Sequence, residues 1–340
     1  MSSNNQAAWI DGKAAQLRVA EAPMPKAEAG QIVIRNKAIA INPVDWKIQD
    51  YGLFIQQWPA VLGEDVAGEV VEVGEGVSSF KKGDRVTSHT LSLVTSKPED
   101  GGFQLYSRAA AAKTAKIPDS MSFAQGSVIP LALDTAAVGL YSDQSSGYLG
   151  LPMPSFNPSS SGKTIVVWGG SSSVGSMVIQ LAAASGAKVV ATASQQNHEF
   201  CKSLGASEVI DYKNASVVDD VVAAVKKVGG TFVGVYDAIS EQDKSYKHTV
   251  PIIEKLGGGS LPVVLGGPEN PPSSVKVGQV FGVNDMTHPI WADYLPKGLE
   301  SGKFRAVPEP LVIGKGLENV QKGMDKNKEG VSAKKVVIEV

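Results

Sequence analysis

A glycine-rich turn near the middle of the chain has the spacing of a phosphate-binding loop. The apolar, strand-like run 164–168 leads into it, and an Ala-rich helix is expected over 174–185. Glycine and other small residues let the backbone approach a pyrophosphate, whose charge is favoured by the N–H groups at the start of the helix. We predict that these residues bind the phosphates of a dinucleotide: Gly169, Gly170, Ser171, Ser172, Ser173, Val174 and Gly175.

The glycine pattern of this turn is incomplete, because Ser172 and Ser173 stand where glycine is common. The alternative interpretation is therefore an ordinary strand–helix turn. Its place after one strand and before a helix and a second strand favours the dinucleotide site.

The end of the next strand, 188–192, predicts which dinucleotide is used. Folds that prefer NAD place an acid near this point to accept the ribose hydroxyls. Ala193 and Ser194 stand here instead, and a small hydroxyl tolerates a 2′-phosphate. We therefore predict NADPH, with Lys202 and Tyr212 as further contacts. For Lys202 the alternative is a solvated helix lysine.

Two textures along the chain predict two kinds of domain. Residues 1 to about 135 contain short β-branched runs broken by Gly and Pro, as in an irregular, mostly antiparallel β domain. From Thr164 onward strands alternate with helices, which predicts βαβ units around a parallel sheet. The expected elements are strands 164–168, 188–192, 208–210, 232–237 and 261–265 and helices 174–185, 197–204 and 216–228. A strand-like end, 334–340, is expected to rejoin the first domain, and the Ser/Gly/Pro-rich segment 142–162 is expected to be a packed surface loop.

Composition excludes several classes of function. The 340 residues carry a formal net charge of −2, with no basic excess for holding nucleic acid. One cysteine, Cys201, rules out a disulfide scaffold and a thiolate metal cage. The N-terminus lacks the basic and apolar regions of a secretory signal, and no apolar run approaches the length of a membrane span. We expect a cytoplasmic protein with no membrane partner.

Several strings, taken in order, resemble the medium-chain dehydrogenase/reductase superfamily. They cover nearly the whole chain, and the match is closest to the zinc-free quinone-reductase-like branch, especially the fungal trans-acting enoyl reductases of polyketide biosynthesis. The strings are Asn42-Pro43-Val44-Asp45-Trp46-Lys47, Leu62-Gly63-Glu64-Asp65-Val66-Ala67-Gly68, Gly83-Asp84-Arg85-Val86, the glycine-rich turn, Thr192-Ala193-Ser194 with Asn197, and Lys202-Ser203-Leu204-Gly205-Ala206.

The resemblance implies a fold of two domains. A GroES-like, β-rich catalytic domain would comprise residues 1–135 and 302–340, and a Rossmann domain with a doubly wound parallel sheet would comprise 136–301. The cofactor would lie between them.

The resemblance also implies site residues. Lys47, Tyr51 and Thr135 are the candidate catalytic residues, with a solvent lysine, a packing tyrosine and a helix-start hydroxyl as the respective alternatives. Contacts to NADPH are implied for Pro43, Val44, Lys47, Thr135, Ser194, Asn197, Lys202, Tyr212, Leu265, Phe281 and Lys334 besides the glycine-rich turn.

The same resemblance allows a test for zinc. The positions that hold Cys, His and Cys in zinc alcohol dehydrogenases correspond to Asn42, Glu64 and about Leu131. A single glutamate cannot hold a tetrahedral zinc. The four histidines show no ligand spacing and are expected at the surface or in hydrogen bonds. We predict no metal.

Without a Lewis acid, alcohol oxidation is hard to run, whereas reduction of an activated double bond needs less. We expect an NADPH-dependent reductase that delivers hydride to the β-carbon of an enoyl thioester or enone, free or carrier-bound. An NADPH quinone oxidoreductase and a non-catalytic NADPH-binding protein remain alternatives. Three prolines after Leu265, beside the expected sheet edge, slightly favour a monomer over a homodimer.

Overall fold

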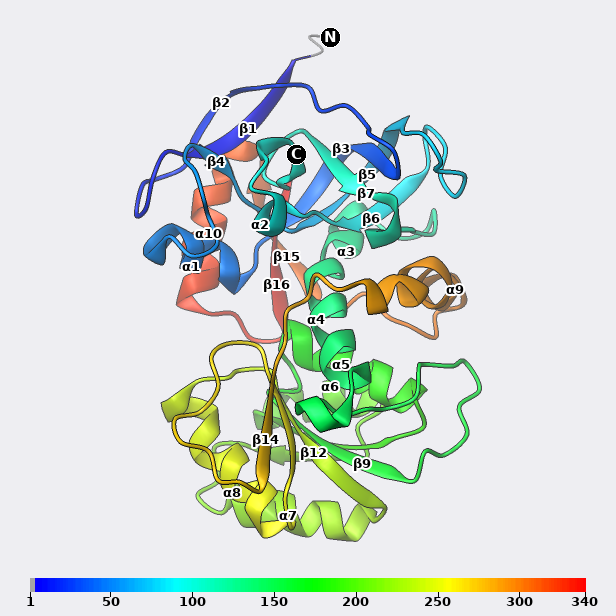
Figure 1. The fold of residues 1–340 in the computed structure, drawn as a ribbon, viewed down its shortest axis with the longest axis vertical. Helices are drawn as coiled ribbons and strands as arrows, with labels where there is room; N and C mark the ends of the chain where they lie inside the picture. The colour runs from blue at the N-terminus through cyan, green and yellow to red at the C-terminus, as the bar shows by residue number, and fades with distance from the viewer. Residues whose placement is uncertain (1–3) are drawn as a thin grey trace. The chain divides into compact units, whose positions relative to one another are not determined.

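The computed structural model describes residues 4–340, which divide into two compact units. The first domain comprises the residues up to Leu131 together with His288–Val340, and the second domain comprises Ala132–Thr287 (Figure 1).

These boundaries differ from the expected 135/136 and 301/302. A π-helical turn, Ile290–Tyr294, and α9, Leu295–Ser301, pack against β8, Thr114–Lys116, of the first domain. Trp291 and Leu295 of this segment are buried. Because burial of large apolar side chains is strongly favourable, the segment belongs to the first domain.

The second domain has the predicted parallel sheet. Its strand order is β11-β10-β9-β12-β13-β14, and every pairing in it is parallel. The central strand β9 is buried on both faces, which explains its continuous apolar sequence. The strands are β9 Lys163–Trp168, β10 Lys188–Ala193, β11 Glu208–Asp211, β12 Thr231–Asp237, β13 Gly259–Val263 and β14 Val275–Gln279.

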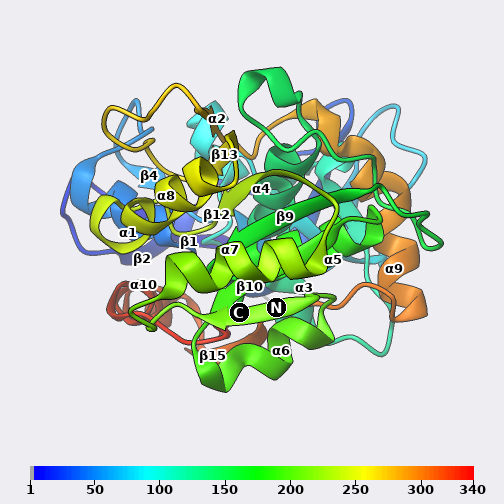
Figure 2. The same ribbon diagram turned by 90° about the horizontal axis from the view of Figure 1, so that it is seen from below.

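Helices cover the two faces of this sheet. The right-handed crossovers put α5 and α6 on one face and α7 and α8 on the other, so α6 and α7 flank β10 (Figure 2). The apolar face of helix α7 explains its packing on the sheet, because Val217, Val221 and Val225 recur every fourth residue and are buried. The helices are α5 Ser173–Ala184, α6 His198–Ser203, α7 Val217–Val228 and α8 Lys247–Lys255, with α4, Pro130–Tyr141, at the start of the domain.

The outer strand β14 was not expected. It pairs with β13 and forms the edge of the sheet, and its sequence VKVGQ contains no proline. The prolines after Leu265 therefore precede the edge strand instead of forming it. The preference for a monomer loses this support and stays a prediction.

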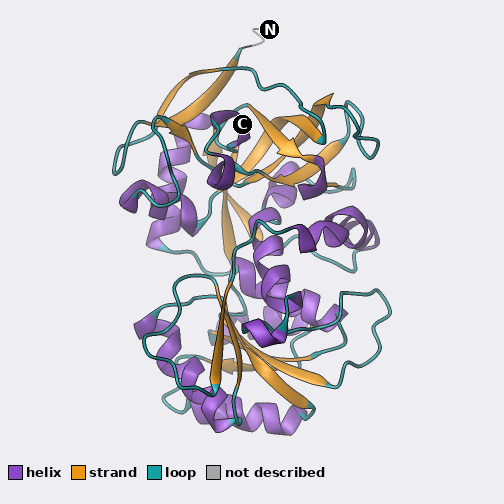
Figure 3. Ribbon diagram, in the orientation of Figure 1, coloured by secondary structure: helices purple, strands orange, loops and turns teal. Residues whose placement is uncertain are grey.

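The first domain consists mainly of strands (Figure 3). One sheet has the order β15-β16-β3-β5-β6-β8, with β7 paired to β3, and a smaller one has the order β2-β1-β4. The strands are β1 Asn5–Ile10, β2 Arg18–Ala22, β3 Gln31–Ala40, β4 Ala60–Val61, β5 Asp65–Val73, β6 Arg85–His89, β7 Tyr106–Ala110, β8 Thr114–Lys116, β15 Glu309–Lys315 and β16 Lys334–Glu339. The C-terminal strand rejoins this domain as predicted, because β16 pairs antiparallel with β3.

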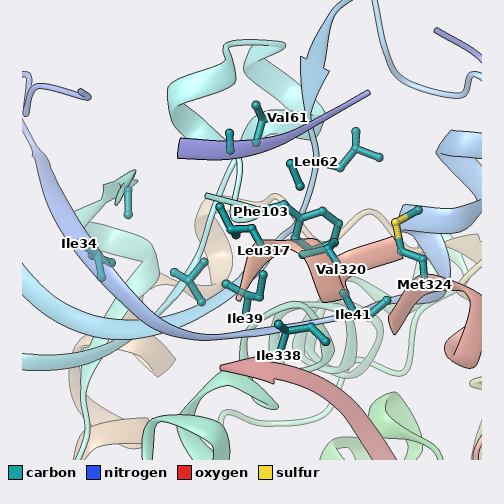
Figure 4. Close-up of a cluster of buried hydrophobic side chains, with 14 of the residues drawn as sticks. Ile34, Ile39, Ile41, Val61, Leu62, Phe103, Leu317, Val320, Met324 and Ile338 are labelled. Carbon is teal, nitrogen blue, oxygen red and sulfur yellow. The ribbon is translucent and has the colours of Figure 1, made fainter. Parts of the chain in front are cut away.

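Apolar side chains from distant parts of the sequence form the core of the first domain. Phe103 lies among Ile39 of β3, Val320 and Met324 of α10, and Ile338 of β16 (Figure 4). The helices of this domain are α1 Pro43–Tyr51, α2 Ser92–Thr95, α3 Phe123–Ser127, α9 and α10 Val320–Glu329. The core thus fixes β16 and α10 beside the strand that precedes α1.

The segment 142–162 packs on the second domain, as expected. Leu149 and Leu151 are buried, and their N–H groups donate to Gly139 and Leu140 of α4. Across residues 4–340, one helical stretch, Phe123–Tyr141, passes a length and hydropathy test for a membrane span, but 83% of it is buried inside the protein. A buried core helix passes the same test.

Candidate functional site

The glycine-rich turn connects β9 to α5 in the second domain. Gly169 has a φ of 81°, which favours glycine, and Ser172 is the N-cap of α5, with its Oγ accepting the N–H of Gly175 at 3.0 Å. Thr192 of the neighbouring strand β10 fixes the turn, because its Oγ1 accepts the N–H of Gly169 at 3.1 Å. The other N–H groups in the first turn of α5 have no acceptor within the helix, because no helical carbonyl precedes them. They therefore point away from the N-terminal end of the helix.

Gly175 is the position where the helix approaches the turn most closely. A Cβ added there would lie 2.1 Å from the carbonyl oxygen of Gly169. Only glycine therefore lets α5 begin directly behind the loop. This arrangement is the one that dinucleotide-binding turns use to place a helix N-terminus at a pyrophosphate.

Three predicted cofactor contacts come together at the end of β10. Asn197 donates from Nδ2 to Ser171 Oγ at 3.3 Å and to Ser194 Oγ at 3.2 Å. The register pairs Ala193 with Asp211, so Ser194 and Tyr212 follow neighbouring strand ends. The group presents hydroxyl and amide donors and no carboxylate from β10, which is the chemistry a phosphate needs.

Two lysines, Lys202 and Lys213, follow this group in the sequence. The ammonium of Lys202 forms an exposed ion pair with Glu199 at 3.0 Å. Tyr212 is 43% exposed, and the ammonium of Lys213 lies 6.0 Å from its ring centroid. The sequence interpretation missed Lys213, although its position directly after Tyr212 was a usable signal.

Thr135 lies on α4 in the same domain. Its carbonyl accepts a hydrogen bond from the buried Tyr236 hydroxyl at 2.7 Å, which ties the middle of the helix to β12. Its Oγ1 would lie 3.4 Å from a Cβ built on Gly282. The predicted contact Phe281 is therefore next to Thr135 in space and is 47% exposed, whereas Leu265 is half-buried at the end of β13.

In the first domain, α1 carries the predicted Lys47. Pro43 is the first residue of the helix, Val44 packs on the core, and Lys47 is half-buried with its ammonium 5.4 Å from the Trp46 ring. Tyr51 ends the helix and is 58% exposed. Its side chain thus belongs to the surface of this domain, where Lys328 of α10 interacts with it electrostatically.

The start of α1 is held by buried carboxylates. Asp45 Oδ2 accepts the backbone N–H of Asn42 at 2.7 Å, and burial raises the pKa of Asp45 to about 7. Asp65 Oδ2 accepts from Asn42 Nδ2 at 2.8 Å, and Asp65 Oδ1 accepts the N–H of Leu131 at 2.7 Å. Two of the positions compared with zinc ligands, Asn42 and Leu131, are thus joined through Asp65.

The third of these positions, Glu64, is fully buried beside His89. Burial, with a smaller contribution from the nearby Asp45, raises the pKa of Glu64 well above its ordinary value. Its Oε1 accepts from Ser92 Oγ at 3.1 Å, and its Oε2 lies 3.7 Å from His89 Nε2. His89 was expected at the surface or in a hydrogen bond; the pairing of β6 with β5 places it in the interior and so excludes the surface position.

These residues do not fit zinc. A catalytic zinc needs three protein ligands, and Glu64 with His89 supplies two. Within residues 4–340 there is no group of three His, Cys, Asp or Glu side chains arranged for a metal ion. No step of the chemistry below passes through a metal.

The predicted Lys334 is an exposed strand residue, and its ammonium pairs with Glu309 of β15 at 2.5 Å. Its neighbour Lys335 is only 3% exposed and reaches Asp65 and Asn42. The sequence interpretation missed Lys335. Successive strand residues face opposite sides of the sheet, so Lys335 lies on the other side from Lys334, but its partners cannot be read from the strand itself.

Comparison with known proteins agrees with both halves of this description. The family model of the alcohol dehydrogenase GroES-like domain matches residues 28–119, and that of zinc-binding dehydrogenase matches residues 173–281. The dehydrogenase orsE of Emericella nidulans is 46% identical, over 99% of this chain and 100% of that protein. The trans-enoyl reductase himH of Aspergillus japonicus is 43% identical, over 99% of this chain and 97% of that protein. The solved structure of mycobacterial Rv1454c complexed with NADPH shares the fold, with a TM-score of 0.71 and 23% identity over 99% of this chain and 100% of that one.

Proposed function

Because this chain belongs to the medium-chain dehydrogenase/reductase superfamily, and is therefore an oxidoreductase, we propose that it reduces carbon–carbon double bonds conjugated to a carbonyl, using NADPH. The observation that carries this proposal is the 43% identity to a trans-enoyl reductase over 99% of the chain. The substrate class is an enoyl thioester or an enone, free or bound to a carrier.

The chain's own residues have defined tasks in this reaction. The cofactor, when bound, supplies a hydride for the β-carbon of the substrate. The amides of Gly169, Gly170, Ser172 and Gly175 hold the turn together, so the amides of Ser171, Ser173 and Val174 bind its phosphates. As negative charge moves to the carbonyl oxygen, the Lys47 ammonium stabilises the enolate and Thr135 orients the reacting groups. Water or a side-chain donor then protonates the α-carbon, which completes the saturated product.

The preference for NADPH follows from the group at the end of β10. A 2′-phosphate brings nearly two negative charges, and an acid at Ser194 would repel it. Ser194, Asn197 and Tyr212 offer donors instead, and Lys213 adds a cation close to Tyr212. This set supports NADPH over NADH.

We propose that the reaction is independent of zinc. The support is the donor set, since Asn42 Oδ1 accepts from an ammonium and no three His, Cys, Asp or Glu side chains within residues 4–340 are grouped as metal ligands. Elemental analysis of chelator-free protein is expected to find far less than one zinc per chain. One tightly held zinc per chain would overturn this part of the proposal.

The remaining expectations concern the location, the oligomeric state and the binding partners of the enzyme. We propose a cytoplasmic monomer that uses a small-molecule or carrier-bound acyl substrate and binds neither nucleic acid nor membranes. Light scattering of the purified protein during gel filtration is expected to give the mass of one 35.5 kDa chain. A mass of two chains would contradict the monomer.

The test of the function is NADPH oxidation across 2-enoyl thioesters, enones, 2-enals and quinones, with purified protein and matched substrate concentrations. We expect turnover of enoyl thioesters or enones to exceed that of quinones. Faster turnover of ortho- or para-quinones would make the enzyme a quinone oxidoreductase, and no turnover across the panel would leave a non-catalytic binder. Lys47→Met should lose most of the activity, whereas Lys226→Met, on an exposed position of α7, should keep it.

A further inference from the structure

A buried ammonium belongs to the polar interior of the first domain. Lys335 of β16 is 3% exposed, and the next three residues of the strand are buried and apolar. Its Nζ lies 3.0 Å from Asp65 Oδ2 and donates to Asn42 Oδ1. Since Asn42 Nδ2 also donates to Asp65 Oδ2 at 2.8 Å, the ammonium, the carboxylate and the carboxamide form a closed ring.

Stability alone does not account for such a ring. Removing two charges from water is costly, and well-packed apolar residues of similar volume often stabilise a protein as much as a buried ion pair does. What the ring does supply is direction, because each of its hydrogen bonds has a fixed geometry. The question is therefore which part of the domain it orients.

The ring meets the start of α1. Asn42 is the N-cap of this helix, with an extended backbone (φ −115°, ψ 155°), and both ends of its carboxamide are engaged in the ring. The other end of α1 is fixed to α10, where Asp50 accepts from Lys328 at 2.7 Å, and in the middle of the helix Trp46 donates to Asn327 of α10 at 3.2 Å. Lys47 lies between these two attachments.

We propose that Lys335 is a positioning residue for Lys47: through Asp65 and Asn42, its ammonium sets the start of α1 and so the direction in which Lys47 projects. The part that concerns Lys47 rests on the proposed function, in which Lys47 meets the cofactor or substrate. The ring also joins Asn42 to Leu131 through Asp65. Asn42 and Leu131 correspond to zinc-ligand positions, and the cation beside them here is the ammonium of Lys335.

The variants follow from the charges. Lys335→Met alone would leave the Asp65 carboxylate buried without its cation. The main variant is therefore Asp65→Asn/Lys335→Met, which removes both charges of the pair together. Lys334→Met is the matched control for the ion pair, because this neighbouring lysine forms an exposed pair with Glu309. Thermal unfolding establishes that each variant is folded.

Hydrogen exchange tests the positioning itself and needs no cofactor. We expect amides of α1 to exchange about tenfold or more faster in the double variant, with amides of β3 and α10 unchanged, and no change in Lys334→Met. Unchanged exchange in α1 would overturn the proposal. If the wild-type protein bound no NADPH, the proposed function would fail while this result would still decide whether Lys335 orders α1.

A cycle with Lys47→Met tests whether the effect passes through Lys47. We expect the double variant to weaken NADPH binding about tenfold in the wild-type background and by less than about twofold in the Lys47→Met background. A purely structural role would reduce binding equally in both backgrounds. Equal losses would therefore overturn the proposal.

Discussion

Replacing Gly175 by alanine should separate α5 from the glycine-rich turn. A Cβ at this position would lie 2.1 Å from the Gly169 carbonyl oxygen, 2.9 Å from its carbonyl carbon and 2.9 Å from Gly170 Cα, whereas ordinary contact begins at 3.4 Å. The neighbours are backbone atoms that cannot rotate away. The start of the helix must therefore move by about 1.3 Å, the difference between 3.4 and 2.1 Å.

A movement of this size is large for phosphate binding. A hydrogen bond to a charged group is worth about 1.5–3 kcal/mol, and a displacement of about 1 Å removes most of one such bond. Loss of one bond corresponds to a dissociation constant for NADPH that is about 10- to 100-fold higher. Titration calorimetry with NADPH measures this directly, and circular dichroism shows whether the variant is folded.

The control is Gly12→Ala, because a Cβ at Gly12 meets no atom within 4 Å. It should leave the affinity unchanged. A folded Gly175→Ala protein that binds NADPH within about twofold of the wild type would refute the placement of the phosphates at this turn.

Three further predictions concern single side chains. Ser194→Asp should reduce the preference for NADPH over NADH about tenfold or more, since it adds a like charge; an unchanged ratio of the two dissociation constants would contradict this. Burial raises the pKa of Asp45 to about 7, so the folded state keeps a proton that the unfolded chain releases above about pH 4. Asp45 should therefore lower the free energy of unfolding as pH rises from about 4 to 7, by up to about 4 kcal/mol, and urea titrations of Asp45→Asn should lose this part of the slope while the contributions of Glu64 and Asp237 remain. Tyr236→Phe should cost about 1–2 kcal/mol in the same assay, because it removes the buried hydrogen bond to Thr135, and a loss below about 0.3 kcal/mol would contradict that assignment.

The second domain could be predicted well from the sequence because its signals are local. The buried strand β9, the turn and the amphipathic helix α7 each carry their own pattern of apolar and small residues. The strand β14 was missed because its short sequence VKVGQ alternates weakly and follows a proline-rich segment. Its place depends on pairing with β13, which is a tertiary property.

The candidate site could be predicted where its residues lie close together in the sequence. Ser171 and Ser194 were expected from the strand–turn pattern and Asn197 from the family resemblance, and the three meet in space. Lys335 was not, because its partners Asn42 and Asp65 are almost 300 and 270 residues away. Only the pairing of β16 with β3 and of β3 with β5 brings them together, and no local pattern reports such a pairing.

The transfer of deuterium from NADPH to substrate tests the central claim most directly. The protein is incubated with a 2-enoyl thioester and NADPH that carries deuterium at both C4 positions of the nicotinamide, and the product is examined by mass spectrometry and NMR. We predict a saturated thioester with one deuterium at its β-carbon. A saturated product without that label, or an unreduced thioester in a preparation that rapidly reduces quinones, would contradict enoyl reduction.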